Sequence, residues 1–168
     1  MDSVKEKEPE QLNVPVPTPF ERLSILTKYK NIAMVGLSEN PFRPSHFAAI
    51  YMLSEGYNII PVNPMSKEIL GRKCYARLSD IPEPVDIVDV FRKPSDVPPL
   101  ADEAIAIGAK VLWMQLGVIN QEAARKAYAA GLQVVMDRCV KIEHARFFGG
   151  LNIIGLDTGV ISSRRRSL

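Results

Sequence analysis

Short apolar segments alternate with helical segments along this chain, and that alternation limits the possible folds more than any other feature. The segments that read as strands are NIAMVGLS, NIIPVNP, VDIVDVF, KVLWMQLG and LQVVMD. They are apolar on both faces, as are the strands of a parallel sheet that is covered by helices on both sides. The pattern predicts an α/β fold with a doubly wound parallel sheet of about five strands and helices on both faces.

Helical spacing of apolar residues marks the segments 20–29, 45–57, 97–109 and 121–131. In the second of these, Phe47, Ile50, Tyr51 and Leu53 fall on one side, and Gly56 is a natural end for a helix. Residues 69–83 show neither the apolar spacing of a helix nor that of a strand, and they are expected to form a loop.

The ends of the chain differ from this regular middle. Residues 1–19 carry four prolines and no periodicity, so we expect an extended arm. Residues 20–145 then form one domain, and residues 146–168 form a tail. The tail combines two glycines, an apolar stretch and turn residues, which predicts a small hairpin or a strand added to a neighbouring subunit, and therefore a possible homodimer.

Composition excludes several classes of protein. A chain of 168 residues that is 46% hydrophobic can bury the core of one compact domain. The net charge is +2 and the only basic cluster is residues 164–166, so a nucleic-acid partner is not expected. No apolar run approaches the roughly 18 residues of a membrane span, and the charged first ten residues do not resemble a signal peptide. We expect a cytoplasmic protein without a membrane partner, whose two cysteines are reduced thiols that bind no metal.

In open α/β sheets, ligands bind outside the carboxyl ends of the strands, where helix N-termini offer unpaired N–H groups to anions. The segments that follow the five strands are GLSENPFRPSH, VNPMSK, FRKPSD, MQLGVIN and DRCVKIEH. A dinucleotide site of the usual NAD kind needs a G-x-G-x-x-G turn and an acidic residue after the second strand. Here the turn reads Gly36, Ser38 and Pro41, and the second strand ends in residues 62–64 without a carboxylate. A plain NAD site is therefore disfavoured.

The first of these segments still suits a phosphate group. Gly36 allows a sharp backbone turn, Ser38 supplies a hydroxyl and Arg43 supplies a cation. Ser45 can cap the helix that begins near His46. An ordinary turn between a strand and a helix, with no ligand, is the alternative for this segment.

Taken together, six segments of the chain resemble the small stand-alone CoA-binding proteins. They are VGLSENPFRPSH, GYNIIPVNP, GRKCY, VDIVDVFRKP, AIGAKVLWMQLGV and DRC. That family is similar to the N-terminal CoA-binding domain of the succinyl-CoA synthetase alpha subunit, and the resemblance covers residues 29–144, most of the chain. It implies a Rossmann-like fold and coenzyme A, or an acyl-CoA, as the ligand.

The resemblance also implies which residues meet the ligand. Gly36, Leu37, Ser38 and Arg43 would contact the phosphates, and Val62, Asn63 and Pro64 would flank the nucleotide. Phe91, Arg92, Lys93 and Pro94 would wall the adenine and ribose-phosphate side, and Gln115, Leu116 and Gly117 would line the remaining rim. The later synthetase domain with its phosphate-carrying histidine has no counterpart in this sequence, so ligase activity is not implied.

Charge favours CoA over NAD independently of the resemblance. CoA carries a 3′-phosphate as well as a pyrophosphate, so its site needs cations where NAD sites keep an acid. Lys67, Arg72, Arg92 and Lys93 lie on or near the relevant segments. The same charges would suit NADP, which leaves an NADP-dependent oxidoreductase as an alternative.

Catalytic residues are less clear from the sequence. His46 stands at a helix start with no partner carboxylate in view, which favours a packing role. Cys139 follows Asp137 and Arg138, where a cation and a helix N-terminus could lower the pKa of a thiol, although a buried inert cysteine is the commoner outcome. Trp113 is most simply a core or pocket-wall residue.

We therefore predict noncovalent binding of coenzyme A or a short acyl-CoA, with no catalytic residue assigned. A nucleotide-sensing regulatory module that acts through a protein partner is the third possibility.

Overall fold

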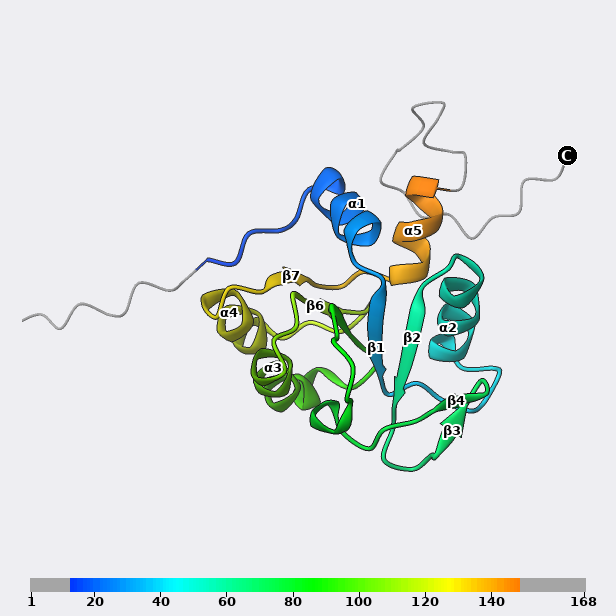
Figure 1. Ribbon diagram of the computed structural model, residues 1–168. Helices are drawn as coiled ribbons and strands as arrows, with labels where there is room; N and C mark the ends of the chain where they lie inside the picture. Colours follow the sequence, from blue (N-terminus) through cyan, green and yellow to red (C-terminus); the bar gives the residue numbers. More distant parts are fainter. Residues whose placement is uncertain (1–12, 149–168) are drawn as a thin grey trace, which may run out of the picture.

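A computed structural model describes residues 13–148 (Figure 1). Its centre is a five-stranded sheet in the order β2-β1-β5-β6-β7, and every neighbouring pair is parallel. The strands are β1 (Asn31–Val35), β2 (Asn58–Val62), β5 (Ile87–Val90), β6 (Val111–Met114) and β7 (Gln133–Val135). The prediction of a doubly wound parallel sheet is confirmed.

Helices cover both faces of the sheet (Figure 1). They are α1 (Pro19–Lys28), α2 (Pro44–Ser54), α3 (Val97–Ala106), α4 (Gln121–Ala129) and α5 (Val140–Phe148). Buried residues of α3 and α4 join the hydrophobic cluster on one face, and those of α1, α2 and α5 join the cluster on the other face. The sheet is therefore enclosed on both sides, and its carboxyl edge is where a ligand has access to the strand ends.

The outward face of α2 differs from the expectation. Phe47 and Ile50 are about half exposed, while the helix buries Ala48, Ala49 and Met52. Small side chains let the helix axis approach the sheet closely, so the alanines take the inner face although the larger residues have more apolar area. The predicted helix end is confirmed, because α2 finishes at Ser54 and Gly56 has a positive φ of 87°.

A small antiparallel hairpin overlaps residues 69–83, which the sequence predicted as a loop. It consists of β3 (Glu68–Ile69) and β4 (Arg72–Lys73), and the 3-10 helices η1 (Leu78–Asp80) and η2 (Pro94–Asp96) lie further along the chain. Two-residue strands carry too little periodicity to be recognised from sequence alone.

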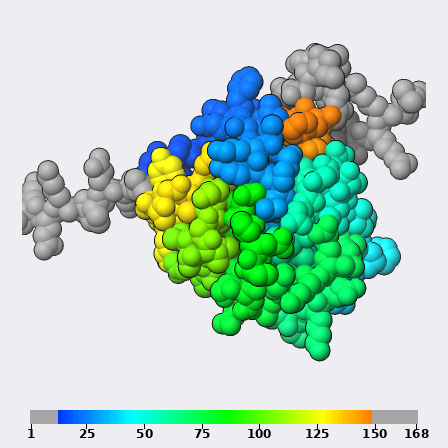
Figure 2. Space-filling view, viewed as in Figure 1, coloured from blue at the N-terminus to red at the C-terminus, as the bar shows by residue number. Residues whose placement is uncertain are grey.

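The N-terminal helix α1 begins with a capping box. The Thr18 hydroxyl accepts a hydrogen bond from the Glu21 N–H, and the Glu21 carboxylate accepts one from the Thr18 N–H. Pro19 is the first residue of this helix, so the described part of the predicted arm is residues 13–18. Figure 2 shows α1, in blue, lying against α5, in orange.

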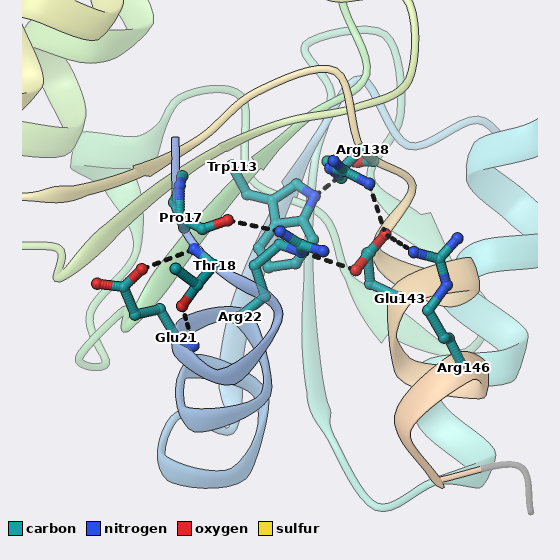
Figure 3. A network of polar contacts seen from close by, with 8 residues as sticks. All are labelled: Pro17, Thr18, Glu21, Arg22, Trp113, Arg138, Glu143 and Arg146. Atoms are coloured by element: carbon teal, nitrogen blue, oxygen red, sulfur yellow. Dashed lines mark hydrogen bonds and ion pairs between the residues drawn. The ribbon is translucent and has the colours of Figure 1, made fainter. Parts of the chain in front are cut away.

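Buried charges hold α1 and α5 together (Figure 3). The Arg22 Nε donates to Glu143 Oε2 at 2.8 Å, and both side chains are almost completely buried. Residues 146–148, which the sequence assigned to the tail, belong to α5. The rest of the tail lies outside the described residues, so the predicted hairpin or added strand, and the homodimer expected from it, stay predictions. Within residues 13–148, no helix has the length and apolar character needed to cross a membrane.

Candidate ligand-binding site

The strand order reverses between β1 and β5, which places the expected ligand crevice at their carboxyl ends. The segments that follow the strands begin at one level, because each first residue is hydrogen-bonded to the end of a neighbouring strand. These bonds run from Gly36 N to Val62 O (2.9 Å), from Phe91 N to Val35 O (2.8 Å) and from Gln115 N to Val90 O (3.3 Å). The structure thus brings together four of the segments that the sequence singled out.

Gly36 makes the turn at the end of β1. Its φ is +88°, in the left-handed region that favours glycine. A Cβ at this position would lie 2.6 Å from the Phe91 carbonyl oxygen and 2.9 Å from Arg92 Cδ. A glycine is therefore required here because the segment that follows β5, the β5 exit, approaches closely, whether or not a phosphate also approaches it.

The loop after Gly36 is held by its own polar groups. The Ser38 N–H donates to Ser45 Oγ at 3.1 Å, the Ser38 hydroxyl accepts from the Asn40 N–H at 3.1 Å, and His46 Nδ1 lies 2.8 Å from the Ser38 carbonyl oxygen. The expectation that Ser45 caps α2 is wrong, because the N-cap is Arg43 and makes no side-chain cap bond. His46 is buried and fastens the loop, in agreement with a packing role.

Asn63 occupies the place where NAD sites keep an acid, directly after β2. Its Nδ2 donates to the Leu37 carbonyl oxygen at 2.9 Å, and its Oδ1 accepts from the Met65 N–H at 2.9 Å. The Cys74 thiol donates to the Asn63 carbonyl oxygen at 3.4 Å. The Asn63 side chain thus ties the ends of β1 and β2 together. Leu37 and Val62 are themselves core residues, while Pro64 is exposed.

Four of the basic residues named above are exposed, namely Arg43, Lys67, Arg92 and Lys93. The Arg92 guanidinium pairs with Asp96 at 3.1 Å across a half-exposed surface. Arg72 does not belong with them: its NH1 group donates to Asn58 Oδ1 at 2.9 Å and to the Ile59 carbonyl oxygen at 3.2 Å. These acceptors lie at the start of β2, so the expectation that Arg72 lies near the strand exits is wrong. The hairpin β3–β4 carries it toward the opposite edge of the sheet.

The exits of β5 and β6 differ in exposure. Phe91 is half-buried and packs against the cluster under α1, α2 and α5. Gln115 is buried, whereas Leu116 and Gly117 are exposed. The Gly117 N–H donates to Asp137 Oδ1 at 2.7 Å, which links the β6 exit to the β7 exit.

Sequence reasoning missed Asp89, the most unusual residue at this edge. It lies in the central strand β5 with no exposed surface, and Gln115 Nε2 donates to its Oδ1 at 2.5 Å. Burial raises the pKa of this carboxyl to about 8, against the opposing effect of the Gln115 hydrogen bond. The segment VDIVDVF holds two aspartates, and Asp89, flanked on both sides by apolar strand residues, was the signal that could have identified it.

Cys139 lies just before α5 and is half-buried. Burial raises the pKa of its thiol, and hydrogen bonds from the Ile142 and Lys141 N–H groups only partly offset that effect. The lowered pKa that the sequence suggested for this thiol is therefore not what the surroundings produce.

Trp113 is a core residue, and its indole N–H donates to the Arg138 carbonyl oxygen at 2.7 Å. His144 belongs to a separate aromatic group with Tyr51 and Phe148.

Residues 30–145 match the family model of the CoA binding domain. The chain belongs to the CoA-binding domain family. The matched range contains the whole sheet and all five strand exits, so the resemblance seen in the sequence is confirmed.

Relatives of this CoA-binding domain are small proteins. The chain is 43% identical over 129 residues to the uncharacterized protein YneT of Bacillus subtilis, covering 77% of this chain and 96% of YneT. A hypothetical protein from Pyrococcus horikoshii OT3 has a solved structure with 42% identity and a TM-score of 0.76, covering 85% of this chain and 98% of its own.

The CoA-binding domain also resembles part of larger enzymes. The dinucleotide-forming acetyl-coenzyme A synthetase 1 of Ca. Korarchaeum cryptofilum matches with 26% identity and a TM-score of 0.57, over 64% of this chain and 26% of the synthetase. The ADP-forming acetate–CoA ligase II of Archaeoglobus fulgidus is 31% identical over 83 residues, which are 48% of this chain and 12% of the ligase.

Proposed function

We propose that this chain binds coenzyme A or a short acyl-CoA noncovalently at the carboxyl edge of its sheet, without ligase activity of its own. Membership of the CoA-binding domain family supports the ligand class. The similarity to one segment of much longer synthetases supports a binding role rather than their full reaction.

The observation that carries the proposal is Asn63 at the end of β2. A ribose diol in an NAD site is held by a carboxylate that is free to accept two hydrogen bonds. The Asn63 side-chain amide instead donates to the Leu37 carbonyl oxygen and accepts from the Met65 N–H, so it offers the diol no such acceptor. The exposed cations at this edge are Arg43, Arg92 and Lys93, and they suit a ligand with a pyrophosphate and a 3′-phosphate.

Three exposed basic residues fit the phosphate groups. Arg43 is the N-cap of α2, where the helix N-terminus also favours an anion, and it would meet the pyrophosphate with the backbone of residues 36–38. Arg92 and Lys93 follow β5 and would meet the ribose-phosphate side. Leu116 and Gly117 would border the rest of the ligand.

NADP is the alternative that these cations also suit, since its 2′-phosphate needs a similar contact. A nucleotide-sensing module would use the same site and add a protein partner. We further propose a cytoplasmic location, as the composition suggested.

Isothermal titration calorimetry of the ligand-free full chain separates these readings. We expect CoA and acetyl-CoA to bind and NAD to bind at least tenfold more weakly, which corresponds to about 1.4 kcal/mol. NAD binding as tight as CoA binding contradicts the proposal, and NADP binding tighter than CoA binding replaces it with the alternative. Native mass spectrometry of the purified protein adds a check, because a retained ligand identifies itself by mass.

A further inference from the structure

Asp89 and Gln115 form a hydrogen bond inside the protein at the carboxyl edge of the sheet. Gln115 Nε2 donates to Asp89 Oδ1 at 2.5 Å, and both residues are buried. The Gln115 backbone is held as well, because its N–H donates to the Val90 carbonyl oxygen at 3.3 Å and its carbonyl oxygen accepts from the Val118 N–H at 2.8 Å. What these backbone bonds leave open is which end of the Gln115 amide points outward.

The neighbours of Asp89 in the sheet supply no other donor. They are Met34 on β1 and Trp113 on β6. Methionine has no polar hydrogen in its side chain, and the Trp113 indole N–H is already donated to the Arg138 carbonyl oxygen. Within residues 13–148, Asp89 Oδ2 is the one buried side-chain polar atom without a hydrogen-bond partner. Gln115 is therefore the donor on which this buried acid depends.

The acid in turn determines the orientation of the Gln115 amide. A carboxyl oxygen in the interior attracts Nε2 and repels Oε1, so Oε1 is directed away from Asp89. Burial raises the pKa of Asp89 and favours the neutral acid, but with the proton on Oδ2 the oxygen Oδ1 still accepts from Nε2. No described residue donates to Gln115 Oε1, and this oxygen is not among the enclosed polar atoms that lack a partner. It therefore stays open as an acceptor at the carboxyl edge.

We propose that Asp89 is a positioning residue of the ligand site, which holds Gln115 so that its Oε1 accepts a hydrogen bond from an amide N–H of the pantetheine arm of CoA. This inference rests on the proposed function, in which Arg43, Arg92 and Lys93 bind the phosphates. A neutral acceptor in a fixed orientation suits a different part of the ligand. Pantetheine carries two secondary amides, and an amide N–H that leaves water needs an acceptor.

The test compares two ligands by isothermal titration calorimetry of the full chain. CoA carries the pantetheine arm, whereas adenosine 3′,5′-bisphosphate carries the nucleotide without that arm. Asp89→Leu removes the acceptor of Nε2, so we expect CoA to bind about tenfold more weakly, as for the loss of one hydrogen bond, while the affinity for the bisphosphate stays the same. Asp89→Asn keeps an oxygen that can accept from Nε2, so it should retain the CoA affinity within about threefold.

Gln115→Met tests whether Asp89 acts through the amide. It should weaken CoA binding about as much as Asp89→Leu does, and the double variant should bind CoA no more weakly than Gln115→Met alone. Asp86→Leu is the matched control, because Asp86 lies just before β5 at the opposite edge of the sheet and accepts from the Asn31 N–H at 3.1 Å. This control should leave the affinities for both ligands unchanged.

The proposal is overturned if Asp89→Leu binds CoA normally, if it loses both ligands equally, if Asp89→Asn is as weak as Asp89→Leu, or if the double variant is weaker still. If Asp89→Leu does not fold, NMR of the wild-type protein decides. Gln115 side-chain amide protons that lie near bound CoA contradict the proposal, and amide protons far from CoA that exchange slowly with water support it. A wild-type chain that does not bind CoA contradicts the proposed function itself, whereas one that binds CoA without these differences between variants loses only this inference.

Discussion

Arg22 on α1 and Glu143 on α5 are 121 residues apart in the sequence and form a buried ion pair with 2.8 Å between Nε and Oε2. Figure 3 shows Arg138 and Arg146 turned toward the same carboxylate, at 3.4 Å and 3.6 Å from its Oε1. Because Arg138 belongs to the β7 exit, the pair joins the N-terminal helix to one wall of the candidate site. The stability of this corner depends on one carboxylate.

Glu143→Gln should therefore destabilise the protein by about 3–5 kcal/mol, because it leaves the buried Arg22 guanidinium without a counter-charge. Arg22→Met should cost less, since Arg138 and Arg146 remain beside Glu143. Urea unfolding measures both. Lys126→Met, which breaks an exposed pair with Asp102, is the control and should change the free energy of unfolding by about 1 kcal/mol or less. Equal effects of Glu143→Gln and Lys126→Met would contradict the structure.

Gly36→Ala should lower the melting temperature more than Gly71→Ala. Both glycines have a positive φ, so each substitution carries a backbone cost of roughly 1–2 kcal/mol. Only at position 36 does the added Cβ also meet the Phe91 carbonyl oxygen, because the space around Gly71 is open. Thermal unfolding followed by circular dichroism compares the two variants, and similar losses would mean that the β5 exit can move away.

Arg43→Ala should weaken CoA binding by roughly 1.5–3 kcal/mol, as expected for a charge-assisted bond to a phosphate. The ligand-free melting temperature should stay the same, because Arg43 is exposed and makes no cap bond with its side chain. Arg77→Ala removes another exposed arginine, one that pairs with Asp80, and serves as the control in calorimetry. Normal CoA affinity in the Arg43 variant would remove this residue from the site.

The dependence of stability on pH should reveal Asp89. Its pKa is raised from 3.8 to about 8 on folding, so the folded protein keeps a proton that the unfolded chain loses above about pH 4. The stability contributed by this proton is complete below pH 4 and is lost as the pH rises toward 8. Asp89→Asn, which cannot ionise, should lack this loss. Urea unfolding at pH 5, 7 and 9 should show the variant gaining on the wild type as pH rises, and parallel curves would show that Asp89 is ionised throughout.

The spacing of apolar residues along the sequence and the composition of the strands determined the fold. The continuous apolar strands could be stable only between two layers of helices, and this predicted the parallel sheet and the edge at which a ligand would bind. The order of the strand exits carried the family resemblance, since each exit begins at a residue that the strand pattern already located. Turn chemistry was equally local, as the positive φ of Gly36 and Gly56 shows.

Long-range contacts decided what the individual residues do. Whether Arg72 reaches the strand exits depends on the direction of the β3–β4 hairpin, whose strands have two residues each. Whether Ser45 caps a helix depends on the position of the Ser38 N–H. The inner face of α2 went to alanines because the distance between helix and sheet is set by packing, which apolar spacing does not encode. The raised pKa of Asp89 depends in the same way on its burial beside Trp113 of β6 and on Gln115, which follows that strand. The spacing of apolar residues therefore determines which helices and strands form and in what order. The burial of a side chain and its hydrogen-bond and ion-pair partners, which set its charge and reactivity, exist only once distant strands and helices are packed together.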